Sequence, residues 1–273
     1  MGSKSKDKSK KITDVQNLAD YRGLEIDKVG IKNIKYPIAV LDKQNGTQHT
    51  VANINLYVNL PHNFKGTHMS RFVEILNQYR RKIDAKSIPE ILREMKQNLN
   101  AESAHLEIEF PYFVEKRAPI TNEPSLMEYI CRFVGSLKKK LDLVVELEVP
   151  IATLCPCSKE ISDKSAHNQR GVIKVAYRAN EFVWIEDIIK LVETSGSSEV
   201  YALLKREDEK FITEHAYDNP RFVEDVVREV AQKMLKKTEI TWFSVEAENF
   251  ESIHNHSAYA FIECDKKKKG NNT

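Results

Sequence analysis

The chain has 273 residues, of which 41% are hydrophobic, so it is long enough to bury one large core or two medium ones. No apolar run approaches the roughly 18 residues that span a bilayer, and the lysine-rich start lacks the apolar stretch of a secretory signal. We therefore predict a cytoplasmic protein with no membrane partner. In such a reducing compartment the four cysteines are expected to bind a metal or act as nucleophiles in preference to forming disulfides.

Charge is unevenly placed along the chain. Lysines give residues 1–11 a charge of +4 and residues 265–273 a charge of +3, so the net +2 leaves −5 for residues 12–264. An acidic body with basic ends is a poor surface for nucleic acid, and we expect no nucleic-acid partner. We expect residues 1–28 to be a disordered or extended basic segment and residues 265–273 to be a basic tail.

In the first half, alternating apolar and polar residues predict strands at 36–41 and 52–60, joined by a hairpin at Asn45-Gly46. Apolar residues at helical spacing then predict a helix over 70–83 and a second helix that begins at Pro89. Strand patterns return at 106–110 and 127–137. The order of elements in this half is therefore ββααββ.

The second half repeats that order. Strands are predicted at 141–153 and 171–177, a helix at 185–193, and final strands at 240–247 and 257–264. A further helix is predicted to begin at Asn219-Pro220, with Asn219 as N-cap and Pro220 in the first turn. The predicted fold class is α+β: two ββααββ modules, 29–139 and 140–264, whose antiparallel sheets are covered on one face by helices.

Residues suited to chemistry gather where the strand 141–153 ends. The chain reads Thr-Leu-Cys-Pro-Cys-Ser-Lys from Thr153, and His167 follows ten residues after the second thiol. Two cysteines and a histidine in a loop suit metal binding or nucleophilic catalysis. Taken alone, Cys155 is equally well a buried small hydrophobe and His167 an ordinary loop histidine, while Cys157 is expected to project away from Cys155.

Five blocks in order resemble GTP cyclohydrolase type IB, a family with a bimodular tunnelling fold. They are Lys-Gly-Thr-His-Met-Ser-Arg-Phe at 65–72, Thr-Leu-Cys-Pro-Cys-Ser-Lys at 153–159, Ala-His-Asn-Gln-Arg at 166–170, Val-Tyr-Ala-Leu-Leu-Lys-Arg at 200–206 and Asn-Pro-Arg-Phe-Val-Glu-Asp at 219–225. The likeness extends over residues 29–264. It implies that the imidazole ring of GTP is opened by hydrolysis, that C8 leaves as formate, and that 7,8-dihydroneopterin triphosphate forms for folate biosynthesis.

The resemblance also implies a divalent metal, Zn²⁺ or Mn²⁺, and a homotetramer with active sites between subunits. Attack on an aromatic carbon needs a stronger nucleophile than water, and a metal lowers the pKa of a coordinated water from about 15.7 to roughly 7. By position in the family's segments, the implied ligands are Cys155, His167, Glu209 and His254, with Cys155 and His167 catalytic. His167 is either a ligand or a proton donor beside the metal. Apart from the resemblance, Glu209 lies in a charged run typical of solvated surface, and His256 is expected to face away from His254.

Substrate contacts are implied in the same way. Glu224 corresponds to a glutamate that holds the purine, and its two oxygens match the two adjacent donors of a guanine edge. By its helical position alone Glu224 is a surface residue. The candidates for binding triphosphate are Lys65, His68, Ser70 and Arg71, just before or within a predicted helix start, and Arg170. The alternative for the first group is a simple turn and helix cap.

Two other functions fit parts of this pattern. A related tunnelling-fold enzyme, such as a nitrile reductase with a cysteine nucleophile, shares the purine-holding glutamate but needs a nicotinamide cofactor and no metal. A structural zinc module instead closes a four-ligand site from Cys155, Cys157, His167 and His254. Metal dependence of turnover separates the first from a cyclohydrolase, and unfolding on chelation identifies the second.

Overall fold

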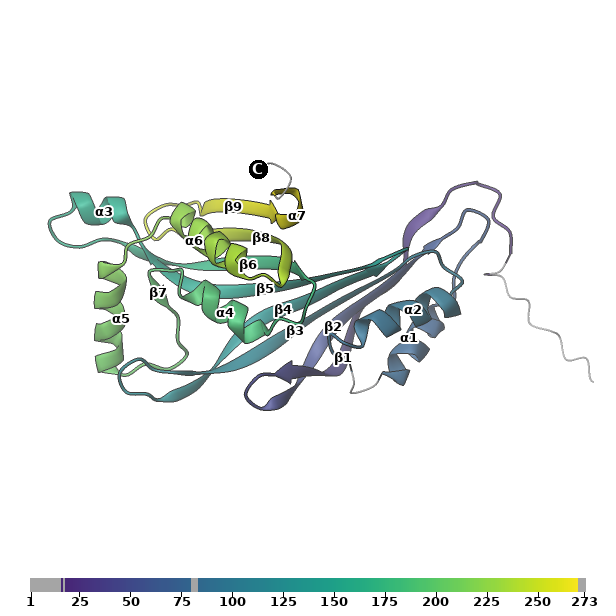
Figure 1. Ribbon diagram of the computed structural model, residues 1–273, viewed down its shortest axis with the longest axis horizontal. Coiled ribbons are helices and arrows are strands. Elements are labelled where there is room, and N and C mark those ends of the chain that lie inside the picture. The colour runs from purple at the N-terminus through teal and green to yellow at the C-terminus, as the bar shows by residue number, and fades with distance from the viewer. Residues whose placement is uncertain (1–15, 17, 80–82, 270–273) are drawn as a thin grey trace, which may run out of the picture.

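The computed structural model describes residues 16, 18–79 and 83–269, so most of the predicted segment 1–28 and the end of the tail 265–273 lie outside the described residues. The described strands form one long antiparallel sheet (Figure 1). The strand order is β1-β2-β3-β4-β5-β6-β8-β9, and the short β7 pairs with β5.

The first half has the predicted ββααββ order. Its elements are β1 (Ile26–Asp42), β2 (Gly46–Leu60), α1 (Met69–Gln78), α2 (Ile88–Asn98), β3 (Ala104–Arg117) and β4 (Pro124–Leu137). At the β1–β2 hairpin the Asp42 carboxylate accepts hydrogen bonds from the backbone N–H groups of Gln44 (2.9 Å) and Asn45 (2.7 Å). Gly46 has φ +80°, a conformation that glycine adopts without a Cβ clash, so the predicted Asn45-Gly46 turn is confirmed.

The second half keeps this order and adds short elements to it. It comprises β5 (Leu141–Leu154), α3 (Pro156–Ile161), β6 (Asn168–Ala179), α4 (Ile185–Glu193), β7 (Ser198–Glu199), α5 (Arg206–Asp218), α6 (Val223–Lys236), β8 (Ile240–Asn249), β9 (Ala258–Asp265) and α7 (Lys266–Lys269). The sequence pattern does not predict α3, β7 or α5. α5 has no apolar stripe, because Asp208 and Ala216 are its buried residues. No helix among the described residues has the length and hydropathy that crossing a bilayer requires.

The predicted start of the last long helix is wrong by three residues, because α6 begins at Val223. Asn219 instead ends α5, and its side-chain amide donates to the carbonyl oxygens of Gly196 (3.1 Å) and Ser197 (3.3 Å). A residue that precedes proline avoids the helical conformation. Asn219-Pro220 therefore separates the two helices and does not start the second.

The two halves share one sheet and do not form two separate sheets. β4 and β5 pair over their length, with Leu137 opposite Leu141, so the sheet continues across the module boundary. One face is apolar from module to module, as shown by the cross-strand row Ile54, Ile108, Phe133, Val145, Tyr177 and Phe243. α1 and α2 lie over one half of the sheet and α4 and α6 over the other (Figure 1). This arrangement confirms the prediction of helices on one face.

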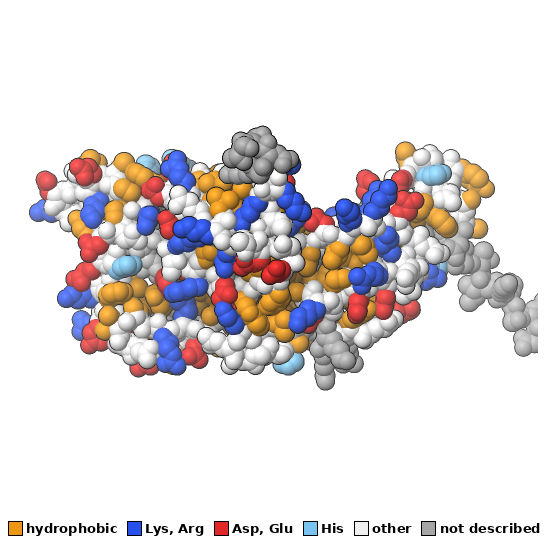
Figure 2. Space-filling model, in the orientation of Figure 1, with side chains coloured by type: hydrophobic (Ala, Val, Ile, Leu, Met, Phe, Trp, Pro, Cys, Tyr) orange, Lys and Arg blue, Asp and Glu red, His pale blue; other side chains and the backbone are white. Residues whose placement is uncertain are grey.

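Between the two helix pairs the apolar face is only partly covered. Figure 2 shows hydrophobic side chains gathered in the middle of this side of the molecule. A hollow there is lined in part by Phe133, Leu143, Val145, Tyr177 and Trp184. Pairing of β4 with β5, more than packing between the helix pairs, therefore joins the two modules.

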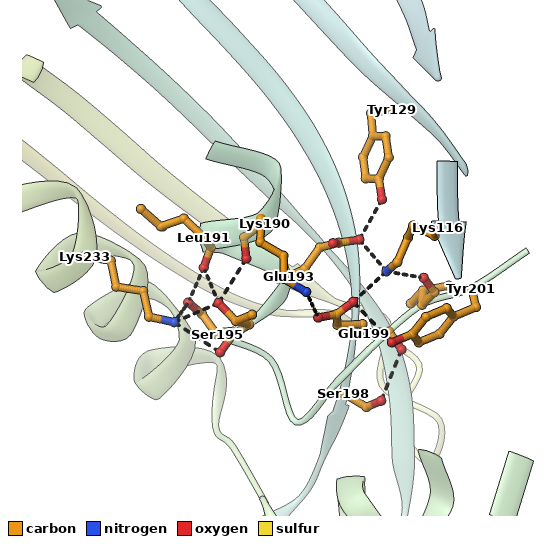
Figure 3. A network of polar contacts seen from close by, with 12 residues as sticks. Lys116, Tyr129, Lys190, Leu191, Glu193, Ser195, Ser198, Glu199, Tyr201 and Lys233 are labelled. Atoms are coloured by element: carbon orange, nitrogen blue, oxygen red, sulfur yellow. Dashed lines mark hydrogen bonds and ion pairs between the residues drawn. The ribbon is translucent and has the colours of Figure 1, made fainter. Parts of the chain in front are cut away.

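A buried ion cluster also ties the first module to the second (Figure 3). The Lys116 ammonium, on β3, donates to Glu193 of α4 (2.7 Å) and to Glu199 of β7 (2.9 Å). Lys116 also donates to the carbonyl of Val200 (2.9 Å), and the Tyr129 hydroxyl donates to Glu193 (2.6 Å). We call Lys116, Tyr129, Glu193 and Glu199 the lysine cluster. It fastens the β7 segment, which leads into α5, to β3 and β4.

Candidate active site

The β5–β6 connection holds Cys155 and His167 in one part-buried loop. The backbone N–H of Cys155 donates to the carbonyl of His167 (3.1 Å). Cys155 is the N-cap of α3, and its Sγ accepts a hydrogen bond from the N–H of Ser158 (3.4 Å). The Ser158 hydroxyl accepts a hydrogen bond from the N–H of His167 (3.3 Å). The loop therefore brings the two predicted catalytic residues together at one end of the sheet.

His167 lies beside two side-chain acceptors. Its Nδ1 is 3.0 Å from Oε1 of Gln169 and 3.8 Å from a carboxylate oxygen of Glu251. Gln169 is buried, and its Nε2 donates to the hydroxyl of Thr153 (2.9 Å). The sequence carries no signal for Gln169, Thr153 or Glu251 as site residues, because each resembles an ordinary strand or loop residue until the fold places it near His167.

Cys157 and His254 differ in position from this pair. Cys157, in the first turn of α3, is exposed, in keeping with a side chain that projects away from Cys155. His254 is exposed in the β8–β9 loop, which lies at the same end of the sheet. The expectation that His256 faces away from His254 is wrong, because the two rings stack with centroids 5.1 Å apart and planes 18° apart. The segment is a loop, so the alternation of a strand does not apply to it.

Glu209 lies at the opposite end of α5 from the Cys155 loop. Lys159 of α3 donates to the carbonyl of Tyr217 in the last turn of α5 (2.5 Å). Glu209 lies two helical turns before Tyr217, about 12 Å along the helix axis. Its side chain is exposed, as the charged run suggests. The structure therefore does not place Glu209 beside Cys155.

The residue before Glu209 is firmly held. The buried Asp208 carboxylate accepts hydrogen bonds from the N–H of Ile120 (2.8 Å) and from the N–H and hydroxyl of Thr121 (2.9 and 2.7 Å) in the β3–β4 turn. It also accepts a hydrogen bond from the N–H of Lys205 (2.9 Å). Burial by itself raises the pKa of a carboxyl, but these hydrogen bonds keep the pKa of Asp208 well below its usual value. The first turn of α5 is thus tied to the β3–β4 turn.

Glu224 and Arg170 lie at the end of the sheet that carries Cys155 and His167. Glu224 is in the first turn of α6, where its exposed carboxylate makes no hydrogen bond or ion pair with the described part of the chain. α6 packs on β8 and is joined to it by residues 237–239, so its first turn lies near the end of β8. Arg170 is exposed on β6, and its carbonyl accepts a hydrogen bond from the N–H of Phe250 (2.8 Å).

The other triphosphate candidates lie at the opposite end of the molecule. Lys65, His68, Ser70 and Arg71 stand in the connection from β2 to α1 and in the first turn of α1. That connection follows the end of β2, which lies level with Leu141 across β3 and β4, whereas Cys155 follows Leu154. The 14 residues of β5 span about 45 Å. One copy of the chain therefore keeps these four residues far from Cys155. The cap of α1 is His68 and not Ser70.

The donor set suits a divalent metal in chemistry, although one chain does not gather all of it. Thiolate, imidazole and carboxylate are ligands that Zn²⁺ and Mn²⁺ accept. Cys155 and His167 share a loop, and a peptide N–H oriented at Sγ favours a thiolate. Within residues 16, 18–79 and 83–269, however, no three His, Cys, Asp or Glu side chains lie together as a metal site would need. Cys155 and His167 form the centre of the candidate site, with Glu209 and His254 on separate elements.

Comparison with known proteins gives one consistent family. A family model described as type I GTP cyclohydrolase folE2 matches residues 12–260. A relative from Geotalea uraniireducens, named GTP cyclohydrolase FolE2, is 61% identical over 259 residues, which cover 95% of this chain and 96% of the relative. A relative of the same name from Geobacter metallireducens is 60% identical over 256 residues, covering 94% of this chain and 98% of the relative.

Solved structures match this chain in fold alone. A uricase from Bacillus fastidious has a TM-score of 0.55 at 6% identity, covering 92% of this chain and 96% of that one. A urate oxidase from Bacillus subtilis 168 has a TM-score of 0.52 at 8% identity, covering 88% and 99%. These proteins have the tunnelling fold. The predicted α+β tunnelling fold is therefore confirmed.

Proposed function

Because the chain belongs to the type I GTP cyclohydrolase FolE2 family, it is a hydrolase that acts on GTP, and we propose that its chemistry takes place at the loop that joins Cys155 to His167. The reaction converts GTP and water to formate, which carries C8, and 7,8-dihydroneopterin triphosphate, the first step of folate biosynthesis. The family match over residues 12–260 carries this conclusion. The position of Cys155 and His167 at the end of β5 supports the location of the site.

The proposed metal ligands are Cys155, His167, Glu209 and His254. A Zn²⁺ or Mn²⁺ ion held there would supply the Lewis acidity that water needs to attack an aromatic carbon at neutral pH. The N–H of Ser158 orients the Cys155 sulfur and stabilises its thiolate form. His167 serves as a ligand or as the proton donor beside the metal. Its Nδ1 contacts Gln169, which leaves Nε2 for either task.

Glu224 is the proposed anchor for the guanine base. Its carboxylate, in the first turn of α6, is exposed and has no partner among the described residues, so both oxygens are available to a ligand. A guanine edge presents a ring N–H and an exocyclic amine side by side, and two carboxylate oxygens accept from both. Arg170, at the same end of the sheet, is the proposed phosphate contact from this copy of the chain.

A second copy of the chain is proposed to complete the site. Lys65, His68, Ser70 and Arg71 contact the triphosphate only if another subunit supplies them, because about 45 Å of β5 separates the two ends of one copy. Among the described strands, β1 and β9 are the outer strands of the sheet, and such edges pair with further strands. Together with the family resemblance, this supports a homotetramer with GTP as its substrate.

Subunit mixing tests that arrangement. The variants Cys155→Ala and Arg71→Ala are each expected to be inactive alone. When the two are dissociated and reassembled together, some sites combine an intact Cys155 with an intact Arg71 from different copies, so part of the wild-type rate returns. Reassembly of each variant alone is the control. If the mixture stays inactive while wild-type subunits recover, the two residues do not meet across an interface.

The remaining proposals concern the setting of the protein. Residues 29–139 and 140–264 are proposed as the two modules, with residues 1–28 and 265–273 as basic ends. The protein is proposed to act in the cytoplasm, without a nucleic-acid or membrane partner. The charge of −5 on residues 12–264 supports the absence of a nucleic-acid surface.

The deciding experiment removes metal with a chelator and adds GTP with or without Mn²⁺ or Zn²⁺. Formate release and the fluorescence of the oxidised pterin are followed together. Both products are expected only with added metal, and Cys155→Ala is expected to abolish them. If neither product forms with either metal, the site does not act as proposed. Circular dichroism of the stripped protein then identifies a structural zinc site by its unfolding, and nicotinamide oxidation with a nitrile substrate identifies a reductase.

A further inference from the structure

A buried hydrogen-bond chain leads to the ring of His167. Thr153 and Gln169 are direct cross-strand partners of β5 and β6, and both are buried, with exposed fractions of 1% and 8%. The Gln169 amide meets the Thr153 hydroxyl at 2.9 Å on one side and Nδ1 of His167 at 3.0 Å on the other. We propose that Gln169, held by Thr153, is a positioning residue that accepts a hydrogen bond from Nδ1–H of His167 and leaves Nε2 as the ring atom that acts in the site.

The strand geometry gives this contact its rigidity. β6 begins at Asn168, and in extended backbone residues two apart lie on the same side, so His167 projects to the side of Gln169. Gln169 is itself locked in the β5–β6 register opposite Thr153. The amide is therefore placed by two paired strands and not by a loop.

The direction of the hydrogen bond follows from the charge nearby. A glutamine amide has an acceptor end and a donor end, and the two ends would select opposite tautomers of His167. A carboxylate oxygen of Glu251 lies 3.8 Å from the same Nδ1, with exposed fractions of 14% for the Glu251 side chain and 15% for that of His167. A negative charge beside Nδ1 favours a proton on that nitrogen. Gln169 then presents Oε1 to His167 and Nε2 to Thr153.

The sheet also fixes Glu251. The ladder between β6 and β8 ends with Gly171 opposite Asn249, and the N–H of Phe250 then donates to the carbonyl of Arg170 (2.8 Å). This bond carries the β6–β8 pairing one step past the strand and delivers Glu251 to the His167 ring. Two acceptors from two different strand ends, Gln169 and Glu251, thus converge on one ring nitrogen.

The inference rests on the proposed role of His167 in the metal site, where an outer partner orients a ligating or proton-donating imidazole. The main variant is Gln169→Leu, which keeps the size of the side chain and removes the acceptor. Gln169→Glu is the rescue variant, because its carboxylate accepts from Nδ1–H and from the Thr153 hydroxyl. Gln48→Leu is the control: it removes a glutamine that bonds to Phe113 in the first module, far from His167.

Two readouts are measured at about pH 8, where an ordinary imidazole is neutral. The ¹⁵N chemical shifts of His167 in metal-free protein report which ring nitrogen carries the proton, and titration with Mn²⁺ gives the dissociation constant. Wild-type protein and Gln169→Glu are expected to carry the proton on Nδ1. Gln169→Leu is expected to populate the other tautomer and to bind Mn²⁺ about 10- to 100-fold more weakly. Thr153→Val, expected to produce a smaller shift in the same direction, replaces Gln169→Leu if that variant does not fold.

The outcomes separate this inference from the function on which it rests. If wild-type His167 carries its proton on Nε2, or if Gln169→Leu matches Gln48→Leu in both readouts, the positioning role is wrong. If His167→Ala binds Mn²⁺ as tightly as wild type, His167 is not a metal ligand and the proposed metal set fails at that residue. The ¹⁵N result still decides the tautomer in that case, because it is measured without metal.

Discussion

The lysine cluster and the loop around His167 are both polar groups placed among buried strands, yet they differ in how completely they are paired. In the lysine cluster, Lys116 meets Glu193 and Glu199, and Lys190 also pairs with Glu199 (2.7 Å). Two ammonium groups thus balance two carboxylates. Around His167, by contrast, the Cys155 sulfur has one hydrogen-bond donor among the described residues and Glu251 lies 3.8 Å from the imidazole.

Burial explains why the two regions differ. The side chains of Lys116 and Glu193 are 8% and 4% exposed, against 15% and 14% for His167 and Glu251. A buried charge is costly unless it is paired and hydrogen-bonded, so the lysine cluster is stable only as a complete set. The His167 loop keeps some access to solvent and can leave donors and acceptors available to a ligand. The comparison teaches that a complete polar network supports the fold, and an incomplete one at the sheet end is suited to chemistry.

Lys116→Met breaks the closed network and has the largest expected effect on stability. It leaves Glu193 and Glu199 without the ammonium that lies between them, so the free energy of unfolding is expected to fall by about 3–5 kcal/mol. Urea unfolding followed by circular dichroism measures the change. Lys139→Met, at an exposed position, is the control. A loss no larger than that of the control would mean that the cluster adds nothing to the fold.

Tyr129→Phe removes one member of the same network and keeps its charges. Burial, together with Glu193, raises the pKa of Tyr129, so its hydroxyl stays a neutral donor to that carboxylate at 2.6 Å. Loss of a hydrogen bond to a charged group is expected to lower the free energy of unfolding by about 1.5–3 kcal/mol. The same urea experiment measures it, with Tyr21→Phe at a 95% exposed position as control. Equal midpoints for both variants would contradict the prediction.

Acid is expected to weaken the fold through its hydrogen-bonded carboxylates. The pKa values of Asp208, Glu199 and Asp142 are held below their usual values in the folded protein, so the unfolded chain binds more protons as the pH falls. The free energy of unfolding therefore decreases from about pH 5 downward. Glu193 works the other way, because burial raises its pKa. Urea midpoints at several pH values measure the slope, and Asp208→Asn is expected to flatten it. An unchanged slope in that variant would exclude Asp208 as a source.

Cys157→Ala sharpens the open side of the comparison and has the smallest expected effect. The thiol is exposed, so its loss is expected to change the free energy of unfolding by less than about 0.5 kcal/mol. Turnover of GTP is expected to stay within about twofold of wild type, or within about 0.4 kcal/mol in barrier height. Formate release under saturating metal measures this. A loss of activity comparable with that of Cys155→Ala would bring Cys157 into the site.

Much of the fold follows from local pattern, and the exceptions have physical causes. The strand and helix periodicities predict ββααββ twice, and α4 is predicted at its observed bounds. α5 escapes prediction because it lies at the end of the sheet and buries little beyond Asp208 and Ala216, so no apolar stripe marks it. Asn219-Pro220 misleads because the same residues suit a helix start and the end of the preceding helix.

The candidate site is predictable only in part for a related reason. Cys155 and His167 stand out because cysteine and histidine are uncommon in a loop after a strand. Gln169 and Glu251 do not, because their importance comes from one contact each, to Nδ1 of His167. The contact with Glu251 depends on the register between β6 and β8, which brings together residues far apart in the chain.

By itself, the sequence determined the order of the elements, the face of each strand that is buried, and the loop that carries Cys155 and His167. Each of these depends on side-chain spacing within a few residues, which the backbone geometry converts directly into exposure or burial. Only the tertiary structure decided that the two modules share one sheet through β4 and β5, and that Lys65 and Arg71 lie at the far end from Cys155. Strand pairing and its register settle such relations, because they depend on whole strands competing for partners along the chain.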